Sequence, residues 1–200
     1  GFDYSCVLVS VGETVEAEVL EKLPSSTEPR GKITLFQALP KGDKMEWIIQ
    51  KSVELGVFRI VPVLTSRCVS RPDGKSMEKK VQRYNKIAAE AAKQAGRAML
   101  PHVALPLNDF AAVCKAFADF DVVLFFYEGG GAPLREVLHP GQYKRVAIVT
   151  GSEGGFSVEE AEAAKAAGAV TVGLGPRILR CETAPLAALT SVMLLTGNLE

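Results

Sequence analysis

The sequence predicts an α/β fold with a mostly parallel sheet. We expect strands at five short apolar runs, namely 33–39, 58–64, 122–126, 146–150 and 170–174. Stretches with helical periodicity or capping residues separate these runs, and strands that alternate with helices are typical of a parallel sheet. The chain has 200 residues, 48% of them hydrophobic, which is enough to bury the core of one such domain.

The N-terminal residues follow a different pattern. Residues 4–20 alternate loosely between apolar and polar side chains around a turn signal at residues 11–13, which predicts a β-hairpin. The segment LPSSTEPRG (23–31) is rich in Pro, Ser and Gly and reads as a linker. Because a lone hairpin is only marginally stable in water, we expect residues 1–22 to be part of a small β domain whose beginning is missing. The chain begins at Gly1 without a methionine, which agrees with a truncated product.

Capping residues mark where several helices begin. Asp43 can cap a helix that starts near residue 44, and Ser157 with Glu160 forms an S-x-x-E capping box. Thr183 can cap the last helix, with Pro185 in its first turn, where proline is tolerated.

The helix expected near 76–97 has an apolar stripe and a basic face. Between Lys75 and Arg97, seven basic residues stand against two acidic ones, a local net charge of +5. An ordinary solvated helix face explains this pattern, and so does a surface for RNA phosphates. Under the second interpretation the candidate phosphate contacts are Arg67, Arg71, Lys79, Arg83, Lys86, Lys93 and Arg97.

The overall composition narrows the function only slightly. Lys+Arg and Asp+Glu both number 23, so any basic surface has to be local. The four cysteines are widely spaced and there are two histidines, so we expect no metal site and a reduced, cytoplasmic location. No run of 18 apolar residues predicts a membrane span, and the N-terminus does not read as a signal peptide.

Three loops are expected at the carboxyl edge of the sheet, where open α/β sheets bind ligands. They are FFYEGGG (125–131), TGSEGGFS (150–157) and LGPRILRCETAPLAAL (174–189). The second lacks the lysine of a nucleotide-binding loop and the spacing of a dinucleotide fingerprint, and Glu153 would repel phosphate. A simple glycine turn remains open for it. In the third, Arg177 and Arg180 bracket two apolar residues, a mixture that suits a flat heterocycle beside an anionic group.

These segments together resemble one known family. TGSEGGFSVEE and VGLGPRILRCETAPLAAL are similar to segments of the ribosomal RNA small subunit methyltransferase E family, which belongs to the SPOUT class and methylates N3 of a uracil in 16S rRNA. GDKMEWIIQKSVELGV (42–57), TSRCV (65–69) and KIAAEAAKQAGRAMLPHV (86–103) resemble other segments of that family, so the similarity covers essentially the whole chain. Two positions depart from the family pattern: Ser152 replaces a proline and Cys181 a threonine.

The resemblance implies two domains. Residues 29–200 are expected to form a SPOUT methyltransferase domain with a C-terminal deep trefoil knot, which composition alone could not indicate. Residues 1–28 are expected to be the remnant of an N-terminal PUA-like β-barrel. The family's barrel is longer than this segment, so part of the usual RNA-binding surface is expected to be absent.

The resemblance also implies a cofactor and a partner. The cofactor is S-adenosylmethionine, bound in a bent form within the knot, and the substrate is 16S rRNA of the small ribosomal subunit. A homodimer is implied as well, with each site near the interface. The implied cofactor-binding residues are Phe126, Thr150, Gly151, Gly155, Leu174, Gly175, Ile178, Leu179 and Thr183.

Uracil N3 carries a proton and is a poor nucleophile until that proton leaves. A positive charge near O2 or O4 would stabilise the anion, and we assign this role to Arg180, with Arg177 as its structural or RNA-binding neighbour. Glu182 or Glu153 can act as the base if burial raises its pKa. Each of these glutamates can equally serve only to pair with a cation or to hold its loop.

Two other functions stay open. One is an RNA-binding module without catalysis, which explains the basic helix but not the three loops. The other is a different SPOUT-class enzyme that acts on tRNA or on a ribose hydroxyl, against which the ILRCETA segment and the 42–57 motif argue.

Overall fold

The computed structural model describes residues 1–199. Its strands are β1 (Phe2–Val11), β2 (Val15–Pro24), β3 (Lys32–Ala38), β4 (Arg59–Val63), β5 (His102–Val103), β6 (Val122–Phe126), β7 (Arg145–Thr150) and β8 (Val170–Val172). Its helices are α1 (Lys44–Glu54), α2 (Gly74–Gln94), α3 (Phe110–Ala116), α4 (Leu134–Val137), α5 (Val158–Ala166) and α6 (Ala184–Leu195), with a short 3₁₀ turn at Phe117–Asp119.

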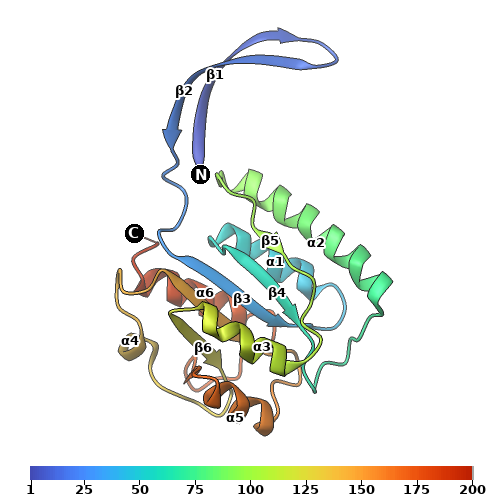
Figure 1. The fold of residues 1–200 in the computed structure, drawn as a ribbon, viewed down its shortest axis with the longest axis vertical. Helices are drawn as coiled ribbons and strands as arrows, with labels where there is room; N and C mark the ends of the chain where they lie inside the picture. Colours follow the sequence, from blue (N-terminus) through green and yellow to red (C-terminus); the bar gives the residue numbers. More distant parts are fainter. Residues whose placement is uncertain (200) are drawn as a thin grey trace.

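Six strands form one parallel sheet in the order β5-β4-β3-β7-β6-β8. The α/β fold class and the five strands expected from apolar runs are therefore confirmed (Figure 1). The sixth strand, β5, has only two residues and lies in no apolar run, so the sequence did not predict it. The central strands β3 and β7 are buried on both faces, which is why they read as continuous apolar segments.

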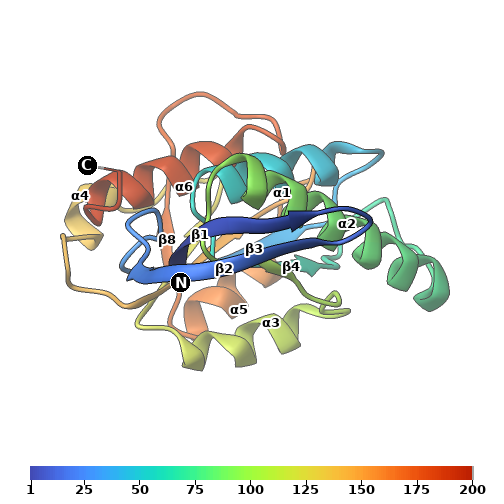
Figure 2. The ribbon, with the colours of Figure 1, turned by 90° about the horizontal axis from the view of Figure 1, so that it is seen from above.

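Helices cover both faces of this sheet. α1, α2 and α6 lie on one side and α3 and α5 on the other (Figure 2). Successive residues of β3 enter different layers, because side chains alternate across a strand: Leu35 belongs to the first core and Phe36 to the second. In the second core, Phe125 of β6 lies 4.4 Å from Phe156, ring centroid to centroid, and supports the loop that follows β7.

One of the three expected caps forms fully. Ser157 Oγ accepts the Glu160 N–H at 3.2 Å, and the Glu160 carboxylate accepts the Ser157 N–H at 2.9 Å. Asp43 and Thr183 stand at the N-cap positions of α1 and α6, but neither side chain accepts a capping hydrogen bond. Side-chain capping was therefore a wrong expectation at these two sites. The reason is backbone geometry: ψ is 5° at Asp43 and −41° at Thr183, whereas a capping residue usually has extended backbone.

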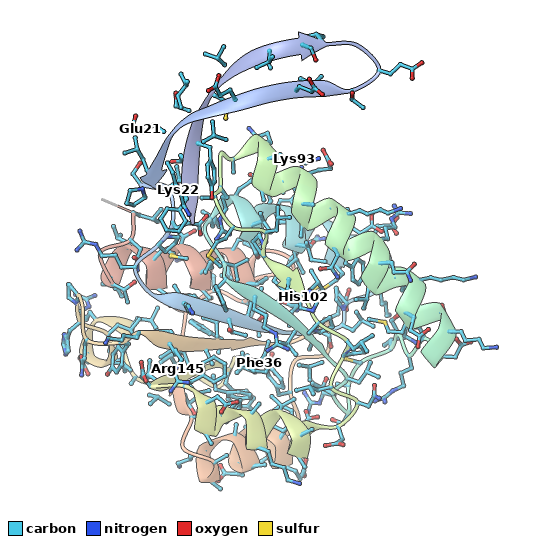
Figure 3. All side chains as sticks on the ribbon, turned by 45° about the horizontal axis from the view of Figure 1, so that its top comes forward. Glu21, Lys22, Phe36, Lys93, His102 and Arg145 are labelled. Carbon is cyan, nitrogen blue, oxygen red and sulfur yellow. The ribbon has the colours of Figure 1, made fainter. Side chains whose placement is uncertain are left out.

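β1 and β2 form the expected antiparallel hairpin, which stands away from the α/β domain (Figure 1). Within residues 1–199 the two strands pair only with each other. Apolar side chains on them are solvent-exposed, among them Tyr4, Leu8 and Val11. Residues 2–24 carry five acidic residues and one lysine, so the hairpin adds no positive surface. Figure 3 shows Glu21 and Lys22 on β2, and Lys93 on α2.

The linker is fastened to the domain by a buried ion pair. The Arg97 guanidinium lies 2.7 Å from the Glu28 carboxylate, and the Arg97 side chain is 4% exposed. Arg97 also donates to the carbonyl oxygens of Val53 and Val57 at 3.2 and 2.6 Å. Arg97 thus joins the linker to the end of α1, and its donors are directed into the protein.

Candidate active site

A cavity of about 630 Å³ opens at the carboxyl edge of the sheet, where β6, β7 and β8 end. Residues 126–130, 151–153, 155–156 and 172–182 line most of it, so the structure brings together the three loops predicted from the sequence to meet at this edge. The volume is within the range of small-molecule and cofactor sites, roughly 300–1,000 Å³.

Seven of the nine expected cofactor-binding residues line this cavity: Phe126, Gly151, Gly155, Leu174, Gly175, Ile178 and Leu179. Thr150 and Thr183 do not line it. Thr150 is buried, and its hydroxyl donates to Gln37 Oε1 at 2.7 Å. Thr183 is exposed at the start of α6.

Gln37 supports the loop after β7 from the neighbouring strand. Its side chain is fully buried in β3, and its Nε2 donates to the Gly151 carbonyl at 3.0 Å and the Ala38 carbonyl at 2.8 Å. With the bond from Thr150, both the nitrogen and the oxygen of this amide group are used. Gln37 was not among the residues predicted for the site, although it is a polar residue inside the apolar run ITLFQAL, which was the available signal.

The loop after β7 closes tightly on itself. The Gly155 N–H donates to the Ser152 carbonyl at 3.0 Å. A Cβ on Gly151 would stand 3.0 Å from Gly155 Cα, and Gly155 has φ of 62°. Glycine at both positions therefore lets the two backbone segments touch beside the cavity.

Lys44, in the first turn of α1, connects two of the loops, and it was not among the residues predicted for the site. Its Nζ lies 3.0 Å from Glu153 Oε1, 3.4 Å from Glu182 Oε2 and 3.7 Å from Cys181 Sγ. The Glu153 carboxylate also accepts the Lys41 N–H at 3.2 Å. The 42–57 motif contained Lys44, but nothing in the sequence placed that motif beside the other two.

These contacts decide the ionisation of both glutamates. The hydrogen bond from the Cys181 thiol, together with Lys44, lowers the pKa of Glu182. Burial works in the opposite direction on Glu153, but hydrogen bonds from its own backbone, Lys44 and Lys41 lower the pKa of Glu153. A glutamate base required a raised pKa, and neither residue meets that condition. We therefore assign neither of them the role of base.

Cys181 is a buried thiol on the cavity wall. Burial, then the hydrogen bond to Glu182 and the charge of Glu153, raise the pKa of Cys181 to about 12. Alkylation requires the thiolate, so we expect iodoacetamide at pH 8 to modify the exposed Cys6 and to leave Cys181 unmodified. Peptide mass spectrometry after timed quenching measures both sites in one sample. Modification of Cys181 as fast as Cys6 would contradict this environment.

Arg177 and Arg180 line the cavity mouth and are both exposed. Within the described part of the chain, neither guanidinium makes an ion pair or a side-chain hydrogen bond. Because a guanidinium carries five N–H donors and is always charged, the two arginines offer unpaired positive charge to a ligand.

The other basic candidates are spread more widely. Lys79, Lys86 and Lys93 are exposed on α2, where Lys93 pairs with Glu90 at 2.9 Å and Arg83 pairs with Glu46 of α1 at 2.7 Å. Arg67 donates to the Gly154 carbonyl at 3.1 Å and so lies against the loop after β7. Arg71 donates to the Thr65 carbonyl at 2.6 Å. Arg97 is withdrawn into its ion pair with Glu28, so we leave it out of any RNA surface.

Two negative findings concern residues 1–199. No group of three His, Cys, Asp or Glu side chains is arranged to hold a metal ion there. Across the same residues, no helix has the length and apolarity needed to cross a membrane.

Comparison with known proteins gives consistent matches. The family model described as RNA methyltransferase domain matches residues 26–193. The ribosomal RNA small subunit methyltransferase E of Bacillus subtilis is 38% identical, over 96% of this chain and 77% of its own length. The protein of that name from Mesomycoplasma hyopneumoniae is 34% identical, over 88% of this chain and 75% of its own length.

Solved structures match over the same extent. The ribosomal RNA small subunit methyltransferase E from Neisseria gonorrhoeae, bound to S-adenosylmethionine, is similar with a TM-score of 0.85 and 32% identity, covering 98% of this chain and 80% of that one. A methyltransferase from Legionella pneumophila in complex with S-adenosylmethionine has a TM-score of 0.85 and 32% identity, covering 96% of this chain and 78% of that one.

Proposed function

Because the chain belongs to the ribosomal RNA small subunit methyltransferase E family of RNA methyltransferases, we propose that it methylates N3 of a uridine in 16S rRNA. It is an S-adenosylmethionine-dependent rRNA methyltransferase. The observation that carries the finer proposal is the pair of unpaired arginines at the mouth of the cavity, beside the apolar and glycine-rich wall. All four cysteines are free, which agrees with the reducing cytoplasm as its compartment.

The cavity fits S-adenosylmethionine chemically. Leu174, Ile178 and Leu179 offer apolar contacts for adenine, and the glycines at 151 and 155 keep backbone groups within reach of a ligand. We assign these five residues to cofactor binding, together with Phe126 and Gly175. When bound, the cofactor supplies an electrophilic methyl group on a positive sulfonium.

The chain's own contribution to the chemistry is electrostatic. Uracil N3 loses its proton to solvent water at the open mouth of the cavity, and negative charge spreads onto O2 and O4. Arg180 stabilises that charge with a guanidinium that makes no ion pair within residues 1–199. Arg177, three residues away on the same loop, holds the RNA. Positioning of the base beside the cofactor supplies a further part of the rate.

A methyl-transfer assay tests this function. Purified protein is incubated with S-adenosylmethionine that carries a labelled methyl group, and with either 30S subunits or naked 16S rRNA. We expect label in rRNA from at least one of the two substrates. Calorimetric titration with the cofactor separates the alternatives: absence of both binding and transfer would favour an RNA-binding module without catalysis.

The trefoil knot and the domain boundary are part of the same proposal. After β8 at the edge of the sheet, the chain returns so that α6 packs on β7, near the middle of the sheet, and on α1. A knotted path through the loops after β6 and β7 makes this return. We place the methyltransferase domain at residues 29–200 and regard residues 1–28, which contain the exposed hairpin, as part of a PUA-like barrel.

We propose α2 as the main RNA-binding surface. Lys79, Lys86 and Lys93 recur every seven residues, so they lie along one side of the helix, and all three are exposed. Arg67, Arg71 and Arg83 extend this surface toward the cavity, although each makes the intramolecular contact described above.

A double charge reversal, Lys79→Glu with Lys86→Glu, tests this surface. We expect weaker rRNA binding and a salt-dependence slope smaller by about 2, since each lysine that contacts a phosphate contributes about 1. Lys115→Glu is the matched control, because Lys115 is exposed on α3 across the sheet from α2 (Figure 2). Filter binding over a salt series measures both, and equal slopes for all three proteins would contradict the proposed surface.

We also propose a homodimer with each site near the interface. On α6, Leu194 is exposed and Ala187 is half-buried, and Ile178 on the cavity loop is 88% exposed. These apolar groups are available for a second copy. Sedimentation at low micromolar concentration is expected to give a dimer, and a clean monomer would contradict it.

A further inference from the structure

Lys44 is the one side chain in the described residues that bridges the loop after β7 and the loop before α6 through ion pairs. Its ammonium contacts Glu153 on the first loop at 3.0 Å and Glu182 on the second at 3.4 Å. Both loops line the cavity. The helix that carries Lys44 packs against α6, so the ammonium is held at the junction of the two loops.

The backbone of Arg180 is hydrogen-bonded into this junction. Its carbonyl accepts the N–H groups of Thr183 and Ala184, both at 2.9 Å, which closes a tight turn around Glu182. Arg180 is therefore two residues from a carboxylate, and its long side chain could reach that carboxylate. In the structure the Glu182 carboxylate instead pairs with Lys44 and accepts a hydrogen bond from the Cys181 thiol at 3.2 Å.

The pairing of Lys44 with the two glutamates determines whether the charge of Arg180 is neutralised. A guanidinium that pairs with a neighbouring carboxylate loses much of the field it can offer to a substrate anion, because the two charges offset each other. Lys44 supplies the positive charge that Glu153 and Glu182 require. Among residues 1–199, Arg180 is thereby left without an ion-pair partner at the cavity mouth.

We propose that Lys44 is a positioning residue for methyl transfer, which retains Glu153 and Glu182 and so keeps Arg180 free for the substrate. This rests on the proposed function, in which Arg180 stabilises the uracil anion. Lys44 borders the same cavity, and in this account its ammonium is held by the two carboxylates and not by the substrate or the cofactor. It acts through the carboxylates that would otherwise neutralise Arg180.

The first test is Lys44→Met, which keeps the apolar stem and removes the charge. We expect kcat for methyl transfer to fall about 100-fold, the loss that misplaced catalytic groups commonly cause, with the KM for S-adenosylmethionine little changed. Lys44→Arg, which can still pair with both carboxylates, is expected to restore most of kcat. Lys51→Met is the matched control, since Lys51 lies on the same helix and pairs with Glu54 at 2.8 Å. We expect the kcat of this control variant to equal that of the unsubstituted protein.

The second test separates this role from a structural one. Adding Glu182→Gln to Lys44→Met removes the carboxylate that would capture Arg180. We expect kcat to recover by roughly tenfold relative to Lys44→Met alone, a coupling of the size seen between residues in contact. A residue that only held the fold would show no such recovery, because the second substitution would add to the damage.

The outcomes are distinguishable. An inactive unsubstituted protein would overturn the proposed function. An active protein whose Lys44→Met variant keeps full kcat would overturn only the role of Lys44. Loss of kcat without rescue by arginine and without recovery in the double variant would also overturn it. Thermal unfolding of every variant shows whether it is folded under assay conditions.

Discussion

Replacing Arg180 with alanine is expected to lower kcat for methyl transfer by two to three orders of magnitude while leaving cofactor binding intact. Arg180 is exposed and makes no ion pair within residues 1–199, so its removal disturbs no internal contact. Loss of one group that stabilises developing charge typically lowers kcat about 10²- to 10³-fold. Single-turnover methylation of rRNA measures the rate, and calorimetry with S-adenosylmethionine measures binding.

Arg177→Ala is the natural companion to this variant. Arg177 lies on the same loop and is equally exposed, but it is assigned to RNA binding. Its removal is expected to raise the KM for rRNA more than it lowers kcat. Full turnover by Arg180→Ala, or an identical loss of kcat in both variants, would contradict the assignment of Arg180 as the group that stabilises the uracil anion.

The second large effect is expected at Gly131, where the loop after β6 lies directly on β8. A Cβ at this position would overlap the Thr171 carbonyl and stand 2.6 Å from Val172 N, and backbone atoms cannot move aside as a flexible side chain can. The neighbouring Ala132 N–H donates to the Thr171 carbonyl at 2.9 Å. Gly131→Ala is therefore expected to lower the free energy of unfolding by about 3 kcal/mol or more and to weaken cofactor binding.

Gly74→Ala is the control for this variant. Gly74 opens α2, a Cβ at this position would point into open space, and its φ is not positive. We expect its free energy of unfolding to stay within about 1 kcal/mol of the unsubstituted chain. Denaturant titration of the two variants side by side measures the difference. Equal stability would show that the loop after β6 is not seated on β8 as described.

The sequence was sufficient for elements that carry a strong local pattern. Continuous apolar runs located the five longer strands of the parallel sheet, and the capping box at Ser157 located the start of α5. β5 was missed because two residues cannot show a period. The caps at Asp43 and Thr183 failed because a capping residue type does not determine the backbone angles that capping requires.

The location of the site could be predicted from the topology of the sheet more than from single residues. Parallel strands end at one edge, so three loops far apart in the sequence had to meet there, and they line one cavity. Lys44 and Gln37 could not be found in this way, because they come from α1 and β3 and are defined by partners more than 100 residues away. The prediction that Arg97 contacts RNA was wrong for the same reason. The basic pattern near α2 does not show that Arg97 forms an ion pair with Glu28, which lies 69 residues earlier in the chain.

The central claim is that the chain transfers a methyl group to N3 of a uridine, and the identity of the modified nucleoside tests it most directly. 16S rRNA, free or in 30S subunits, is incubated with the protein and labelled S-adenosylmethionine, digested to nucleosides and analysed by mass spectrometry. The account predicts labelled 3-methyluridine. Label on a ribose hydroxyl or on another base would contradict it.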